Sequence, residues 1–196
     1  MAEEHGQVVE EEPEQRDPER EARRRLALAQ IRQYPDPALR MRAAEIVGID
    51  DDLRRLAERM LPLMADANGI GLAATQVGVL RRMFVCRLGE EDDEQTYAFV
   101  NPAVTPVGEE RDTSDEGCLS LQGVLVPVER PVRVRLEATE LRGEPIALDL
   151  DGLDARVVQH ELDHLDGVLI LDRTTDEARR EALATLRPRP LLVARP

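Results

Sequence analysis

The sequence predicts an α+β protein in which mixed or antiparallel sheets pack around a central helix that carries the pattern H-E-x-x-H, with further helices toward the two ends of the chain. Three features of the sequence support this fold class. A segment with helical apolar spacing (50–66) is followed by short β-branched runs (82–150) and then by a second helical segment (153–166). No internal repeat is present, so one folded domain with tails is expected.

Composition suggests where that domain begins and ends. Residues 1–25 are dominated by Glu and Arg, include His5 and cannot bury much apolar area, which predicts an acidic tail that is disordered or loosely helical. The folded domain is expected over 26–176, and a C-terminal helix with a Pro/Arg-rich tail over 177–196. Near the start of the domain, YPDPALR (34–40) has two prolines around an aspartate and predicts a turn.

The first helix is expected from about Asp50 to Asp66. Three aspartates (50–52) supply an N-cap and favourable charge at its positive end. Five apolar residues share one face at helical spacing: Leu53, Leu56, Met60, Leu63 and Met64. Pro62 lies inside this pattern and should kink or interrupt the helix. Asn68-Gly69 then supplies a stop signal.

Four runs rich in β-branched residues predict the strands: RMFVCRL (82–88), TYAFVNPAVTPV (96–107), VLVPVERPVRVRLEA (124–138) and PIALDL (145–150). A second helix is expected from about Leu153 through His164, ending before Gly167. A last helix is expected over 176–186, because the recurring prolines of RPRPLLVARP cannot continue it.

Composition also limits the possible functions. The formal net charge of −14 argues against a DNA-binding protein. No stretch approaches 18 consecutive apolar residues and the N-terminus lacks the apolar run of a secretory signal, so a cytoplasmic protein without a membrane span is expected. Two cysteines, Cys86 and Cys118, are too few for a disulfide framework.

The segment QHELDHLDG (159–167) predicts a metal site. His160 and His164 are four residues apart on one helix face, and Glu161 can reach a water bound to the same ion. A catalytic site usually needs a third protein ligand. His5 is the one remaining histidine, so a downstream carboxylate or a cysteine is expected; the carboxylates are Asp172, Asp176, Glu177 and Glu181. Cys86 fits a buried strand, whereas Cys118, in DEGCLSL before a strand, is the better candidate.

Three segments, in order, resemble the motifs of peptide deformylases: GIGLAATQ (69–76), EGCLS (116–120) and QHELDHLDG. YPDPALR is similar to that family's opening segment, and the resemblance covers about residues 28–175. It implies a metal-dependent hydrolase that removes the N-formyl group from the formylmethionine of newly made polypeptides. The partners it implies are nascent N-formylmethionyl peptides and, through the segment 178–190, a weak contact with the ribosome; a monomer is expected.

The resemblance also implies a role for each matching residue. Cys118, His160 and His164 would bind one divalent ion, Fe²⁺ in the family, with Zn²⁺ or Ni²⁺ as alternatives. Glu161 would be the general base and acid, and Gln76 with the N–H of Leu119 would stabilise the oxyanion. The remaining roles are substrate binding by Ile70, Gly71, Leu153 and Val157, and support of the cysteine loop by Glu116 paired with Arg130.

One departure from the family pattern follows the cysteine motif. Gln122 stands where the family usually has proline, which removes a turn restraint. Two alternatives remain open beside the deformylase: an H-E-x-x-H metallopeptidase with a carboxylate as third ligand, and a catalytically silent metal-binding protein that interacts with a partner.

Overall fold

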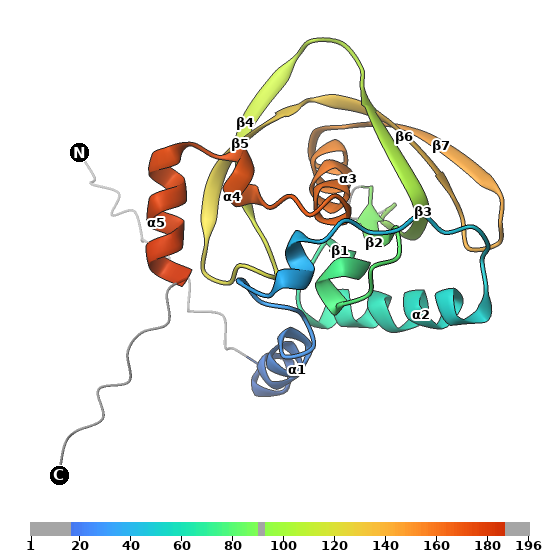
Figure 1. The fold of residues 1–196 in the computed structure, drawn as a ribbon, viewed down its shortest axis with the longest axis horizontal. Helices are drawn as coiled ribbons and strands as arrows, with labels where there is room; N and C mark the ends of the chain where they lie inside the picture. Colours follow the sequence, from blue (N-terminus) through green and yellow to red (C-terminus); the bar gives the residue numbers. More distant parts are fainter. Residues whose placement is uncertain (1–16, 90–92, 187–196) are drawn as a thin grey trace, which may run out of the picture.

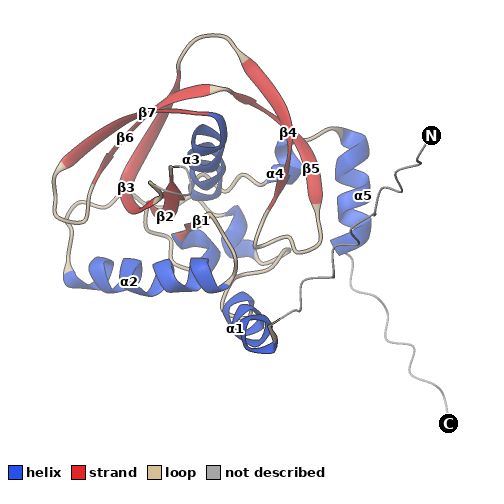
Figure 2. Ribbon diagram, turned by 180° about the vertical axis from the view of Figure 1, so that it is seen from behind, coloured by secondary structure: helices blue, strands red, loops and turns tan. Residues whose placement is uncertain are grey.

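Two antiparallel sheets form the frame of the molecule (Figures 1 and 2). The computed structural model describes residues 17–89 and 93–186. The larger sheet has the strand order β1-β2-β3-β6-β7, and the smaller pairs β4 with β5. The strands of the larger sheet are β1 (Gly71–Ala73), β2 (Met83–Leu88), β3 (Gln95–Pro106), β6 (Arg133–Thr139) and β7 (Pro145–Asp151). The smaller sheet consists of β4 (Arg111–Gly117) and β5 (Leu125–Pro131). The predicted α+β class, with helices toward both ends, is confirmed.

The predicted strand over 124–138 is two strands that belong to different sheets. β5 ends at Pro131, which has no N–H to donate to a ladder, and the next N–H, that of Val132, bonds the carbonyl of Glu110 outside both sheets. β6 then pairs with β3 and β7. The strand β4 was not predicted, because Glu116 is its one buried residue and its sequence has no apolar alternation.

Helix α3 (Gly152–Leu165) contacts strands of both sheets. In Figure 1 it lies within the arc that β3, β4, β6 and β7 describe. One side of the helix is packed with Ala155, Val158 and Leu165, none of which has any exposed surface. The buried set on this helix also includes polar side chains, which a purely structural helix would place in solvent.

Helix α2 (Asp51–Asp66) packs its apolar face on the larger sheet. Asp50 is the N-cap, and its carboxylate accepts from the N–H of Leu53 at 2.7 Å. The predicted interruption at Pro62 is wrong: the helix runs continuously through it. Pro62 and the residue four positions before it, Glu58, are both exposed, so water can satisfy the carbonyl that proline leaves without a donor.

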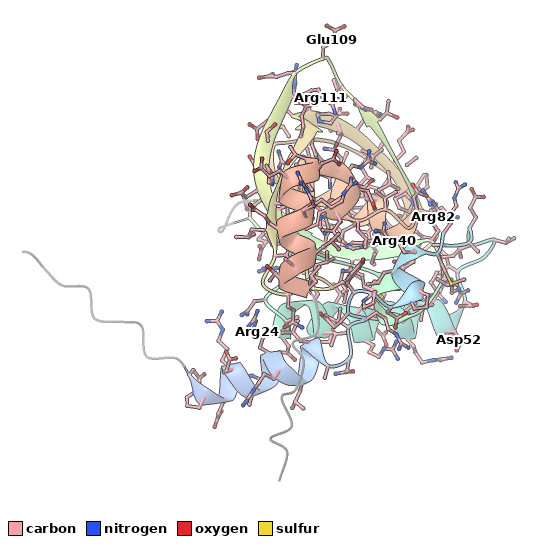
Figure 3. All side chains as sticks on the ribbon, turned by 60° about the vertical axis from the view of Figure 1, so that its left-hand side comes forward. Arg24, Arg40, Asp52, Arg82, Glu109 and Arg111 are labelled. Atoms are coloured by element: carbon pink, nitrogen blue, oxygen red, sulfur yellow. The ribbon has the colours of Figure 1, made fainter. Side chains whose placement is uncertain are left out.

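The remaining helices surround this core. They are α1 (Pro18–Leu28), the 3₁₀ turns η1 (Pro37–Arg40) and η2 (Ala74–Val77), α4 (Ile170–Arg173) and α5 (Asp176–Leu186). Charged side chains cover the outside, with Glu109 in the connection between β3 and β4 and Arg111 at the start of β4 (Figure 3). Among the described residues, no helix is both long and apolar enough to cross a membrane.

The stretch expected to be a disordered or loosely helical tail contributes to α1. Asp17 caps this helix, Pro18 occupies its first turn, and Ala27 and Leu28 at its end are buried. Those caps and that apolar end explain why a helix forms in a segment of such polar composition. Residues 1–16, with His5, and residues 187–196 lie outside the described residues.

Candidate active site

His160, Glu161 and His164 occupy the inner side of α3. Helical geometry brings the two imidazole rings to a centroid separation of 4.9 Å. Glu161 and His164 are almost fully buried, and the His160 side chain is 14% exposed. The pattern read from the sequence therefore produces one polar cluster inside the protein.

Cys118 completes that cluster from the loop after β4. Its Sγ lies 3.2 Å from His164 Nε2, and one ligand atom from each of Cys118, His160 and His164 lies within 4.8 Å of the others. One sulfur and two nitrogens at this spacing match the donors that bind a transition metal. No other group among the described residues offers three such ligand atoms. The cysteine lies at the end of one strand, not at the start of the next as the sequence suggested.

The downstream carboxylates expected as alternative ligands do not join this group within the described structure. Asp172 bonds the side chain of Arg40 and accepts from the N–H of Leu169 at 2.8 Å. Asp176 lies in an exposed ion pair with Arg179. Cys86 is buried in β2, as expected of a core cysteine, and burial raises the pKa of its thiol.

Glu161 is positioned by the absence of a side chain at Gly71. A Cβ at Gly71 would lie 2.3 Å from Glu161 Oε1, closer than atoms can approach. Glu161 Oε2 is buried and has no hydrogen-bond partner in the described structure. Burial raises the pKa of this carboxyl to about 7. An unpaired carboxylate oxygen with such a pKa is suited to accept and return a proton near neutral pH.

Gln76 reaches the cluster from η2. Its Oε1 accepts from the N–H of Ala73 at 2.8 Å, which directs the amide nitrogen the other way. That Nε2 donates to Ser120 Oγ at 3.1 Å and lies 3.7 Å from Cys118 Sγ. The side chain is buried and its donor is fixed beside the cysteine loop.

A buried ion network holds His160 and the cysteine loop. Glu116 Oε2 lies 3.0 Å from His160 Nδ1, and Arg130 donates to both oxygens of Glu116 at 2.6 and 2.9 Å. Burial opposes charge on Glu116, but Arg130 and His160 outweigh it and lower the pKa of this carboxyl far below its usual range. An Nδ1–H that donates to Glu116 leaves His160 Nε2 free as a ligand atom.

Arg130 also connects this loop to helix α3. Its Nη1 donates to Asp163 at 2.9 Å, and Asp163 is held from its other side by Arg173 at 2.6 Å. Arg156, one helical turn before His160, donates to Glu116 at 2.8 Å. Sequence reasoning did not single out Arg156, Arg173 or Ser120. The position of Arg156 at i−4 from a candidate ligand was a usable signal, since such residues share a helix face.

A cavity of about 770 Å³ opens onto these residues. The expected substrate-binding residues Ile70, Gly71, Leu153 and Val157 all line it, together with Glu161 and His160. Leu153 is 62% exposed and Ile70 37%, which leaves apolar surface uncovered at the opening. A Cβ at Gly69 would lie 2.7 Å from Leu119 Cδ1, so the glycines of GIGLAATQ make room for neighbouring side chains of the protein itself.

Comparison with known proteins agrees with this geometry. The family model for Polypeptide deformylase matches residues 28–180. A peptide deformylase of Alkalilimnicola ehrlichii is 46% identical over 155 residues, which are 79% of this chain and 86% of that protein. A peptide deformylase of Chromohalobacter salexigens is 43% identical, over 84% of this chain and 96% of the other. The fold is similar to that of the peptide deformylase from Synechococcus elongatus in complex with actinonin, with a TM-score of 0.74 and 39% identity over 79% of this chain and 85% of that one.

Proposed function

The chain belongs to the polypeptide deformylase family, and we propose that Glu161, Gln76 and the backbone N–H of Leu119 form its reaction centre. The activity is the metal-dependent hydrolysis that removes the N-formyl group from newly made polypeptides. Formate and a free N-terminal amine are the products. The observation that carries the assignment of residues is the unpaired Oε2 of buried Glu161, a residue that lines the same cavity as Cys118 and His160, whose ligand atoms lie with that of His164 within 4.8 Å of one another.

Cys118, His160 and His164 would hold the metal ion. The donor set fits a divalent transition metal, and the buried, charge-balanced support at Glu116 fits a histidine fixed as a ligand. When bound there, the ion would supply Lewis acidity to water and to the formyl oxygen. Fe²⁺ is the proposed native ion, with Zn²⁺ and Ni²⁺ compatible with the same ligands.

Glu161 would move the proton. It takes one proton from the attacking water as the new C–O bond forms at the formyl carbon, and gives it to the leaving nitrogen as the C–N bond breaks. Because Glu161 Oε2 has no partner in the described structure, it is free to make both contacts without breaking an existing hydrogen bond.

Gln76 and Leu119 would stabilise the negative charge that develops on the formyl oxygen. The amide of Gln76 is held with its Nε2 turned toward the cysteine loop, so little reorientation is needed as charge develops. Ile70, Gly71, Leu153 and Val157 would hold the methionine side chain in the cavity, which offers apolar surface at its opening.

We propose a catalytic domain over residues 26–176, with 177–196 as a C-terminal helix and tail. The family match over 28–180 supports this division. The chain is proposed to act as a monomer in the cytoplasm on emerging polypeptides, with at most a weak ribosome contact through the arginines of α5.

The decisive experiment is purification without oxygen, metal analysis, and measurement of formate release from formyl-Met-Ala-Ser. One equivalent of a divalent metal and steady formate release are expected. A fully metallated protein that releases no formate would contradict the proposal. A Cys118→Ser variant tests the ligand set: it should lose the native metal, whereas a metallopeptidase with a carboxylate ligand would keep it.

A further inference from the structure

The two proposed oxyanion donors lie on separate segments of the chain. Gln76 belongs to η2, and Leu119 follows the strand β4. Two side-chain contacts join these segments directly, from Gln76 Nε2 to Ser120 Oγ at 3.1 Å and to Cys118 Sγ at 3.7 Å. Two donors can stabilise one oxyanion only if their separation is fixed, so other contacts that link these segments bear on the reaction.

Residues 31–34 cross both segments. The N–H of Arg32 donates to the carbonyl of Gln76 at 2.7 Å, and the N–H of Tyr34 donates to the carbonyl of Ser120 at 2.9 Å. Ile31 is 3% exposed and anchors the crossing segment in the core. The backbone on either side of Gln33 is therefore bound to one donor segment and then to the other.

The side chain of Gln33 fills the interval between these two backbone bonds. Its Nε2 donates to the carbonyl of Leu119 at 3.0 Å and to that of Ile31 at 3.2 Å, which uses both of its hydrogens. Its Oε1 accepts from Nε2 of Gln122 at 3.0 Å. Gln122 stands where the family usually has proline, so here a side-chain contact takes the place of a ring that would restrain the loop.

These bonds fix the backbone on both sides of Leu119. The carbonyl of Cys118 accepts from the N–H of Leu121 at 3.0 Å. Since a trans peptide is planar, this bond directs the N–H of Leu119 to the opposite side. Gln33 holds the next peptide plane through the carbonyl of Leu119. With both planes held, rotation about the Leu119 backbone is restricted and the direction of its N–H is set.

We propose that Gln33, oriented by Gln122, is a positioning residue for the deformylation step and acts through the peptide of Leu119. This inference rests on the proposed function, because it takes Gln76 and Leu119 as the oxyanion donors. None of the hydrogen bonds that the Gln33 side chain makes in the described structure goes to a metal ligand or to Glu161, so its removal should disturb the transition state and leave metal binding intact.

The test compares three variants with the metallated wild type. Gln33→Ala is expected to lower kcat about tenfold and leave KM and metal content unchanged. Gln33→Glu keeps the shape of the side chain but loses the donor, and should lower kcat at least as much. Gln122→Leu removes only the contact that orients Gln33, and should lower kcat about twofold to threefold. Gln30→Ala is the control, because Gln30 is exposed and its side-chain amide, among the described residues, donates to the carbonyl of Leu26 alone.

A double-variant cycle separates positioning from general stability. In a Gln76→Leu background, Gln33→Ala should have less effect on kcat than it has alone, because the Leu119 N–H that Gln33 positions then no longer has Gln76 as a second donor to the same oxyanion. Wild-type kcat in both Gln33→Glu and Gln122→Leu would overturn the proposal, and so would fully additive losses. If Gln33→Ala loses metal, Gln33→Glu, which keeps the side-chain shape, and Gln122→Leu decide. Full activity of Gln76→Leu alone would instead contradict the oxyanion assignment itself.

Discussion

Removing the charge of Arg130 should be among the most destabilising single changes in this protein. Arg130 and Glu116 are each 5% exposed at their side chains, and Asp163 is 11% exposed. Arg130→Met keeps the aliphatic volume but leaves two buried carboxylates short of their shared cation. Breaking such a buried pair typically costs about 3–5 kcal/mol. Arg156 still bonds Glu116 and Arg173 still bonds Asp163, so the expected loss lies near the lower figure, about 3 kcal/mol.

The assay is urea unfolding of metal-loaded protein, with Arg135→Met as the matched control. Arg135 pairs with Asp149 on the surface, at 47% and 74% exposure, and its loss should cost less than about 1 kcal/mol. Arg130→Met should also weaken metal binding about 10- to 100-fold, because Glu116 then no longer orients His160 firmly. Equal stability losses in the two variants would refute the reasoning that burial makes the Arg130 network strong.

Two further changes test the packing around Glu161 and the cap of α2. Gly71→Ala should retain metal but lower kcat about 100-fold, because the added Cβ would displace Glu161. Gly48→Ala is the control and should leave kcat unchanged, because no atom lies within 4 Å of the added Cβ. An active Gly71→Ala would show that Glu161 tolerates displacement. Arg81 lowers the pKa of Asp50 to about 2, which is below the pKa of an aspartate in the unfolded chain. The stabilisation that this ion pair gives the folded protein is therefore present above about pH 4 and is lost as the pH falls toward 2. The free energy of unfolding of the wild type should therefore fall more between pH 4 and pH 2 than that of Asp50→Asn. If the two free energies fall in parallel, this ion pair does not stabilise the folded protein.

The fold followed from local sequence wherever one face of an element is apolar. Helix α2 has Leu53, Met60 and Met64 at helical spacing, and all three are buried. β4 was not predicted because backbone pairing with β5 forms this strand, and the polar side chains of RDTSDEG do not indicate that pairing. The break between β5 and β6 could not be predicted either, because buried and exposed side chains continue to alternate across Val132. The two segments are separate strands because they pair with strands of different sheets.

The residues of the site also differ in how far the sequence could predict them. His160 and His164 could be paired from their spacing because one helix turn joins them. Cys118 could be named from motif order, but its distance from His164 depends on how β4 meets α3. The contacts of Gln33 with Leu119 and Gln122 were beyond sequence reasoning, because 86 residues separate Gln33 from Leu119 and no periodicity relates them.

The most direct test of the central claim is the Glu161→Gln variant, which keeps the shape of the side chain and removes its basicity. Prepared without oxygen beside the wild type, it should bind one equivalent of metal through Cys118, His160 and His164. Its kcat for formate release from formyl-Met-Ala-Ser should fall at least about 100-fold, the usual contribution of a general base. Metal-loaded Glu161→Gln that releases formate at the wild-type rate would contradict the assignment of Glu161 as the group that moves the proton.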